Sequence, residues 1–296
     1  MSKLFKSAFS TARHFWFLQR KKGLRQRIMR DYGQSTDREI KEVITFIQRH
    51  PEIELPVGMR PPYEWVDEYR PQNVPVGKDE KTGLLYVTFN GYRIFFPRDS
   101  TVEGVQSSAS ICLMEQDSRS PHRYVGDGFN VDEGDVGVFI GASNGLFCAS
   151  LIDRLSKAYL FEPDSMWHEP LRCTFAPWGN KAEILPLAAG SETTTFQTSL
   201  DDFFKNRPFP NYIQADVEGA ELSVLNGAQR ILQHSSKLRL SFCTYHNRID
   251  FSRFESLLRG AGYEISHSPG YYFIGVRMPY FRRGILYASR FSKSAR

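Results

Sequence analysis

Several features that would assign this chain to a familiar class are missing from it. Its four cysteines are scattered and form no CxxC pair, so the sequence indicates neither a disulfide framework nor a structural zinc site, and a reducing compartment fits. No stretch approaches the roughly 20 apolar residues of a membrane span. The N-terminus is a poor signal peptide, because Arg13 and His14 interrupt its apolar residues. These absences favour a cytoplasmic location.

Acidic residues are missing from both ends. Residues 1–30 contain nine Lys or Arg and no acid, and no acid follows Glu264, whereas six further Lys or Arg do. The 23 basic residues between these ends face all 33 acids, so the centre carries a net charge of −10. This pattern disfavours a nucleic-acid binder with one large basic face. The basic, aromatic N-terminal segment fits either a helix packed on the main domain or an amphipathic segment lying on anionic lipid, and the sequence leaves both alternatives open.

The chain does contain a regular alternation of strands and helices. Its length of 296 residues suits one large α/β domain with a smaller appendage. Alternation of this kind predicts a doubly wound, mostly parallel sheet covered by helices on both faces. The short turn at Pro269–Gly270 predicts that one of the last two strands is antiparallel to its neighbour. The predicted strands lie at 136–140, 158–162, 182–187, 211–216 and 238–243, and near 263–267 and 271–276.

The N-terminal third predicts separate local elements. A helix is predicted over 36–49, with Thr36 and Glu39 as a capping box. Residues 51–83 are rich in Pro, Gly and charge and predict an extended linker. The run "LLYVTFNGYRIFF" predicts a hairpin with Asn90 and Gly91 as a type I′ turn. We therefore expect a helical and β-hairpin extension at 1–109, a main domain at 110–276 and a basic tail at 277–296.

A glycine turn follows the first strand of the main domain, in "GVFIGASNGLF" (137–147). A P-loop is excluded, because no Lys-Ser or Lys-Thr follows Gly145. The dinucleotide fingerprint GxGxxG is also absent, so the close approach of a pyrophosphate loses its spacing. What remains is a looser turn that suits a nucleoside cofactor. The predicted cofactor contacts on this turn are Gly141, Ala142, Ser143, Asn144 and Gly145.

A carboxylate stands at the end of the next strand, "AYLFEP". Glu162 can accept hydrogen bonds from both hydroxyls of a ribose, as an acid at this position does in nucleoside-binding sheets of this type. A turn that cradles a nucleoside without holding a pyrophosphate suits S-adenosylmethionine. Pro163, Ala188 and Asp216, at the end of a later strand, complete the predicted cofactor contacts.

Three acids cluster in "DVEGAELSVLNGA". Asp216 lies at the carboxyl end of a buried strand, where ligands bind in open α/β sheets. Glu218 and Glu221 begin the following helix. They could simply complement the positive helix N-terminus, which is worth roughly 0.3–1 kcal/mol each. Three acids in six residues exceed that need, so we expect a functional role.

Together these motifs resemble the FkbM-type family of S-adenosylmethionine-dependent O-methyltransferases. The resemblance covers roughly residues 110–276 and is carried by "DVEGAELSVLNGA", "LFEPD", "SLDDFF", "SPHRY" and "CTYH". It implies a seven-stranded class I methyltransferase sheet with an antiparallel last strand, and action on hydroxyls, often those of sugars. Two positions depart from the family pattern: Phe139 replaces an acid that helps order the glycine turn, and Gln214 replaces a Lys. Asn144 and Asp135 are candidates to compensate for Phe139.

Candidate residues for methyl transfer lie around the three acids. His246, just beyond the fifth strand, is the first candidate for a general base, because the unperturbed pKa of histidine, about 6.5, suits neutral pH. Asp216 is a competing base or an acceptor ligand, and Glu218 is the third catalytic candidate. No metal is expected, since the sheet alone does not bring these three into a defined geometry. The predicted acceptor-binding residues are His122, Arg123, Tyr124, Glu221 and Tyr245.

The sequence therefore predicts a methyltransferase that acts on a hydroxyl of a glycan or lipid-linked saccharide, with S-adenosylmethionine as cofactor. The basic ends would suit peripheral contact with a membrane. Two alternatives stay open: a cofactor-binding scaffold that has lost catalysis, because of Phe139, and a nicotinamide-dependent oxidoreductase, which the glycine spacing disfavours. The sequence does not indicate an oligomeric state.

Overall fold

A computed structural model describes residues 21 and 23–291 of the chain. Most of the predicted N-terminal basic segment, and residues 292–296 of the predicted tail, lie outside this range. Within the described part, no helix has the length and apolar character needed to cross a bilayer.

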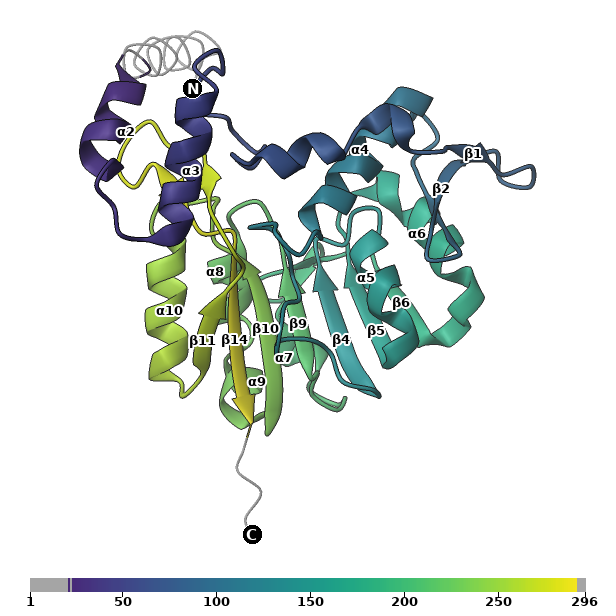
Figure 1. Ribbon diagram of the computed structural model, residues 1–296. Coiled ribbons are helices and arrows are strands. Elements are labelled where there is room, and N and C mark those ends of the chain that lie inside the picture. The colour runs from purple at the N-terminus through teal and green to yellow at the C-terminus, as the bar shows by residue number, and fades with distance from the viewer. Residues whose placement is uncertain (1–20, 22, 292–296) are drawn as a thin grey trace, which may run out of the picture.

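A seven-stranded sheet forms the centre of the molecule, in the order β11-β14-β10-β9-β4-β5-β6 (Figure 1). Every strand runs in the same direction except β14, which is antiparallel to both of its neighbours. The predicted doubly wound, mostly parallel sheet is confirmed. Its strands are β4 (Asp135–Ile140), β5 (Leu155–Phe161), β6 (Ala182–Leu185), β9 (Tyr212–Ala215), β10 (Lys237–Cys243), β11 (Glu264–His267) and β14 (Ile285–Phe291).

The position of the last sheet strand differs from the prediction. The predicted strand near 271–276 contributes only β12 (Tyr272–Phe273), which pairs with β13 (Phe281–Arg282) outside the sheet. The last sheet strand is β14, which lies within the predicted basic tail at 277–296. Its alternate residues are buried in opposite core layers, Ile285 on one face and Leu286 on the other. Burial on both faces, between β10 and β11, makes this segment a central strand in spite of its flanking arginines.

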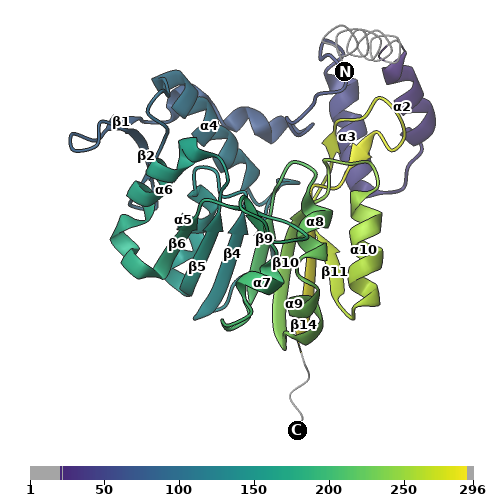
Figure 2. The same cartoon turned by 180° about the vertical axis from the view of Figure 1, so that it is seen from behind.

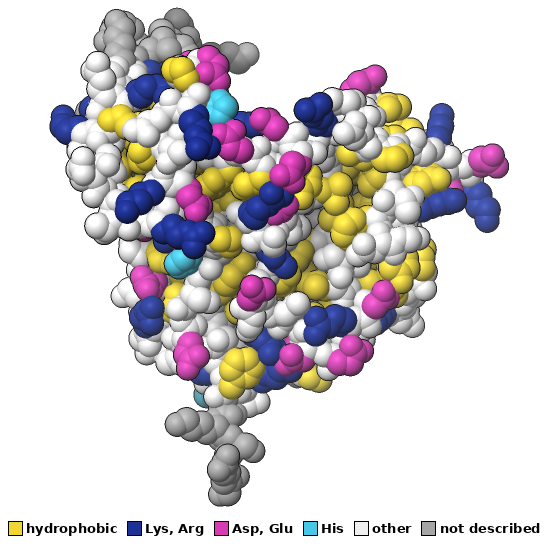
Figure 3. Space-filling view, viewed as in Figure 1, with side chains coloured by type: hydrophobic (Ala, Val, Ile, Leu, Met, Phe, Trp, Pro, Cys, Tyr) yellow, Lys and Arg dark blue, Asp and Glu magenta, His cyan; other side chains and the backbone are white. Residues whose placement is uncertain are grey.

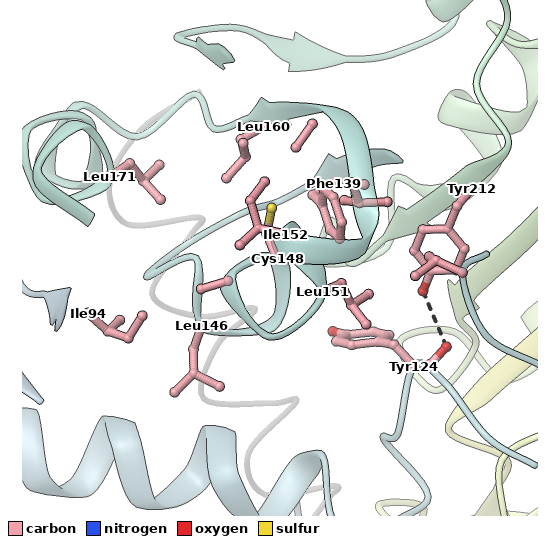
Figure 4. Close-up of a cluster of buried hydrophobic side chains, with 14 of the residues drawn as sticks. Ile94, Tyr124, Phe139, Leu146, Cys148, Leu151, Ile152, Leu160, Leu171 and Tyr212 are labelled. Atoms are coloured by element: carbon pink, nitrogen blue, oxygen red, sulfur yellow. Dashed lines mark hydrogen bonds between the residues drawn. The ribbon is translucent and has the colours of Figure 1, made fainter. Parts of the chain in front are cut away.

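Helices cover both faces of the sheet (Figures 1 and 2). One apolar layer packs against α4 (Val102–Glu115), α5 (Leu146–Leu151) and α6 (His168–Phe175), and Figure 4 shows part of it. The predicted boundary at residue 110 falls inside α4, which therefore belongs to the main domain. The opposite layer packs against α7 (Leu200–Phe203), α8 (Glu221–Asn226), α9 (Gln229–His234) and α10 (Asp250–Gly260).

The N-terminal helices pack on the small β12–β13 sheet through a separate apolar cluster. Helices α2 (Leu24–Tyr32) and α3 (Arg38–Arg49) bury their apolar residues against the β12–β13 pair. The predicted helix at 36–49 is confirmed, but its cap is Asp37 and not Thr36: the Asp37 carboxylate accepts hydrogen bonds from the amides of Glu39 and Ile40, at 2.8 and 3.2 Å.

The predicted hairpin is confirmed in its turn and in its register. Strands β2 (Leu85–Phe89) and β3 (Tyr92–Phe95) pair Phe89 with Tyr92, and Asn90 and Gly91 both have positive φ, as a type I′ turn requires. The hairpin packs on α6. The remaining short elements are β1 (Gly77–Lys78), β7 (Ala188–Ala189), β8 (Gln197–Thr198), and the 3₁₀ helices η1 (Glu64–Glu68), η2 (Pro71–Asn73), η3 (Ile152–Arg154), η4 (Ser165–Trp167) and η5 (Ala176–Lys181).

Candidate active site

A cavity of about 540 Å³ opens at the carboxyl ends of β4, β5 and β9. This is the position where ligands bind in open α/β sheets, and the volume lies within the usual range for small-molecule sites. In Figure 3 hydrophobic side chains gather on the hollowed face between the lobe of α2 and α3 and the lobe of α4 and the hairpin. The predicted cofactor contacts that line the cavity are Gly141, Ala142, Ser143, Asn144, Glu162, Pro163, Ala188 and Asp216.

The glycine turn forms one wall of this cavity because its backbone can pass very close to β9. Gly141 has φ 76°, and a Cβ at this position would lie 2.0 Å from the carbonyl oxygen of Asp216. No other residue fits without moving one of the two segments. Gly145, also at positive φ, packs behind the turn against the ring of Phe175 and does not line the cavity, contrary to the prediction.

Glu162 fixes the turn to the end of β5. Its carboxylate is 6% exposed and accepts hydrogen bonds from the backbone amides of Ser143 (2.8 Å) and Asp164 (2.9 Å), one on each oxygen. A carboxylate offers about four lone-pair sites. Glu162 therefore keeps acceptor capacity on the side that lines the cavity, where a ribose diol could donate to it.

Phe139, which replaces the family's acid, belongs to the apolar layer below the turn. The residue is 1% exposed, and its ring packs against those of Phe147 and Tyr212, with ring centroids 5.8 and 6.0 Å away. Figure 4 shows Phe139 and Tyr212 within this layer. Of the two candidates to compensate for it, Asp135 begins β4 at the opposite edge of the sheet and pairs with Lys237, so it is excluded. Asn144 does line the cavity.

Asp216 stands where the cavity meets the end of β9. Its Oδ2 accepts a hydrogen bond from the Tyr124 hydroxyl (2.7 Å) and lies 3.3 Å from Nε2 of His122. Burial works to raise the pKa of Asp216, but His122 and Tyr124 outweigh it and lower that pKa to about 2. The Asp216 carboxylate is therefore ionised, and its buried Oδ1 has no hydrogen-bond partner.

His246 approaches the same carboxylate from the loop after β10. Its Nδ1 lies 2.8 Å from Oε1 of Glu221, and its Nε2 lies 3.6 Å from both Asp216 Oδ1 and Glu218 Oε2. Burial works to lower the pKa of His246, but Glu221 and the neighbouring carboxylates raise it above its usual value. The three predicted catalytic residues, His246, Asp216 and Glu218, thus converge at one point, with Asp216 and Glu218 lining the cavity.

Glu221 has a different role from the predicted acceptor binding. Its side chain is fully buried. Besides contacting His246, it accepts a hydrogen bond from the backbone amide of Val217 (3.0 Å). It does not line the cavity. Glu221 therefore orients the His246 ring and fixes the turn that follows β9.

The other predicted acceptor-binding residues are mostly buried behind Asp216. His122 and Tyr245 are 2% and 4% exposed and contact each other, with His122 Nε2 lying 3.0 Å from the Tyr245 hydroxyl. Burial works to lower the pKa of His122, but Glu115 and Asp216 raise it. Neither residue lines the cavity, and neither does Arg123; of this predicted set, only Tyr124 does.

Sequence reasoning missed Glu115, at the C-terminal end of α4. Its carboxylate lines the cavity and lies 3.8 Å from Nδ1 of His122. Burial and the charge of Asp216 raise the pKa of Glu115. The sequence does contain an indication of this role. An acid in the last turn of a helix interacts unfavourably with the helix dipole, so its presence there suggests a function other than helix stability.

Residues 189–265 match the family model of the methyltransferase FkbM domain. This match confirms the FkbM-type resemblance. The FkbM-type segment contains Asp216, Glu218, Glu221 and His246, whereas the glycine turn and Glu162 precede it and are assigned to the same site by the geometry described above.

Solved methyltransferase structures resemble this chain only weakly. The methyltransferase FkbM of Methylobacillus flagellatus KT is 17% identical with a TM-score of 0.45. The alignment covers 86% of this chain and 63% of that one, so this chain spans less than two thirds of that protein's length. A putative methyltransferase from Streptococcus mutans, solved in complex with SAH, is 11% identical with a TM-score of 0.36. That alignment covers 54% of this chain and 90% of the other. No curated protein matches the sequence. With such TM-scores, the fold assignment rests on the strand order itself.

Proposed function

We propose that this protein is an S-adenosylmethionine-dependent O-methyltransferase that acts on a hydroxyl of a glycan or lipid-linked saccharide. The observation that carries the proposal is the cavity in which the glycine turn, Glu162 and the Asp216–Glu218–His246 cluster meet. The FkbM domain match supports methyl transfer, and the saccharide acceptor rests on the family resemblance.

The residues present fit the cofactor. Gly141 leaves room that a Cβ would fill, and Glu162 has free lone pairs directed at the cavity for a ribose. The apolar side chains of Phe139 and Phe147 line the same space and suit a purine and a thioether. The ionised Asp216 adds negative charge that favours a sulfonium or an ammonium group.

When bound, S-adenosylmethionine supplies a methyl group on a sulfonium. Transfer to an acceptor oxygen would leave the carbon–sulfur electron pair on sulfur and would require the acceptor hydroxyl to lose its proton. The chain's own contribution is to hold the acceptor oxygen in line, worth roughly 7–11 kcal/mol, and to help remove that proton. Asp216, Glu218 and His246 lie together where this proton would be released.

Calorimetric titration with S-adenosylmethionine and S-adenosylhomocysteine tests the proposal. We expect micromolar binding by the wild type and a loss of roughly 10- to 100-fold in Glu162→Ala, because hydrogen bonds to a charged group contribute about 1.5–3 kcal/mol. Glu183→Ala is the matched control, since this acid lies on the neighbouring strand β6 and outside the cavity.

Each alternative predicts its own outcome, in this titration or in a separate measurement. A well-folded wild type that binds neither compound, with or without saccharide acceptors, would favour the inactive scaffold. Quenching of NADH fluorescence by the protein would favour the oxidoreductase. Sedimentation that is unchanged by anionic vesicles would remove the proposed membrane contact of the basic ends.

A further inference from the structure

Three ligand-type atoms converge at the mouth of the cavity. Asp216 Oδ1, Glu218 Oε2 and His246 Nε2 all lie within 4.8 Å of one another. Two ligands of a tetrahedral ion at about 2.1 Å stand about 3.4 Å apart. The two observed distances of 3.6 Å from His246 Nε2 are close to that spacing. Small side-chain movements would therefore close the cluster on a single ion.

A second observation comes from the groups behind these three atoms. Glu221, fully buried, lies 2.8 Å from Nδ1 of His246, which favours the tautomer with the proton on Nδ1 and a lone pair on Nε2. Metal-binding histidines are commonly held by a carboxylate in this manner. The Oδ1 atom of Asp216 is buried and has no hydrogen-bond partner, and it faces the same point. A buried acceptor without a hydrogen bond, 3.6 Å from an oriented imidazole nitrogen, is an arrangement that a cation between the two atoms would satisfy.

The charge balance around the cluster supports this conclusion. Four carboxylates surround it, from Glu115, Asp216, Glu218 and Glu221. The positive groups nearby are the imidazoles of His122 and His246 and the guanidinium of Arg282, which donates hydrogen bonds to the backbone oxygens of Tyr245 and His246. The balance stays negative when all four carboxylates are ionised and both imidazoles are protonated. Buried negative charge without a counter-charge is unfavourable, and a divalent cation would neutralise it.

A neighbouring group of His122, Asp216 and Cys243 is less suited to a cation. Burial raises the pKa of the Cys243 thiol well above its usual value, and the thiolate is the metal ligand. His122 Nε2 is also engaged with the Tyr245 hydroxyl.

We propose that Asp216, Glu218 and His246 bind a divalent first-row cation at the mouth of the cavity, where it also binds the acceptor hydroxyl. One nitrogen and two carboxylate oxygens suit ions such as Mn²⁺ or Zn²⁺. A cation lowers the pKa of a hydroxyl bound to it, so the hydroxyl proton passes to solvent water and His246 acts as a ligand and not as a base. This inference rests on the proposed function and deepens it.

The test is a titration of the full chain with Mn²⁺, in which the electron paramagnetic resonance signal of the free ion measures how much Mn²⁺ remains unbound. We expect one bound Mn²⁺ per chain, and binding weakened at least about 10-fold in Glu218→Gln. The Glu218 side chain is 91% exposed, so this variant keeps the fold. Glu264→Gln, with an exposed acid on β11 away from the cluster, is the matched control and should bind as the wild type does.

Absence of Mn²⁺ binding, or equal binding by Glu218→Gln and the wild type, overturns the inference. The proposed function is tested separately, by titrating the protein with S-adenosylmethionine in the presence of a chelator. Cofactor binding without Mn²⁺ binding would leave the methyltransferase proposal standing and return His246 to the role of base. Mn²⁺ binding without cofactor binding would leave the cation site standing and would refute the proposed methyltransferase function alone.

Discussion

Gly141 offers the sharpest test of how the glycine turn is built. In Gly141→Ala two separate penalties are expected. The residue has φ 76°, which costs an alanine about 1–2 kcal/mol, and the added Cβ would lie 2.0 Å from the carbonyl oxygen of Asp216. Overpacking of this kind typically costs a further 1–3 kcal/mol or so, and here it must move the turn or the end of β9.

Gly128→Ala separates these penalties. Gly128 has φ 75°, but a Cβ there would meet nothing within 4 Å. Thermal unfolding of both variants should therefore show an extra loss of about 1–3 kcal/mol in Gly141→Ala, or about 2–10 °C in Tm. Titration with S-adenosylmethionine should show weakened binding in Gly141→Ala alone. Equal stability of the two variants, together with unchanged cofactor binding, would refute the close approach of the turn to β9.

Three further tests address other parts of the structure. Phe139→Asp places an acid at the position where the family pattern has one. Because the Phe139 ring fills an apolar layer, this variant should lose about 3–5 kcal/mol of stability in chemical unfolding and should not bind the cofactor more tightly. Tighter cofactor binding would contradict this reasoning. Asp37→Ala should cost about 1 kcal/mol of stability and Thr36→Ala almost nothing, whereas the reverse order would restore the predicted capping box. Leu286→Asp should prevent folding, as judged by circular dichroism, while Phe291→Asp on the same strand, at a position 52% exposed, should be tolerated; a folded Leu286→Asp would argue against β14.

Features set by neighbouring residues could be predicted from the sequence. The hairpin register follows from Asn90 and Gly91, because their positive φ values fix which residues face each other. The alternation of strands and helices predicted the parallel sheet, and with it the positions of Glu162 and Asp216 at the same edge. In each of these cases the decisive interaction spans few residues, or follows from the direction of parallel strands.

Tertiary structure decided what depends on distant partners. Strand β14 looked like a basic tail, and only its insertion between β10 and β11, with both faces buried, makes it central. The roles of Glu221 and His122 were likewise hidden, because a carboxylate or an imidazole in sequence does not show whether it faces a cavity or another side chain. The sequence by itself determined which chemical groups reach the edge of the sheet. The packing of the chain decided which of them meet a ligand, since burial and hydrogen-bond partners are properties of the whole fold.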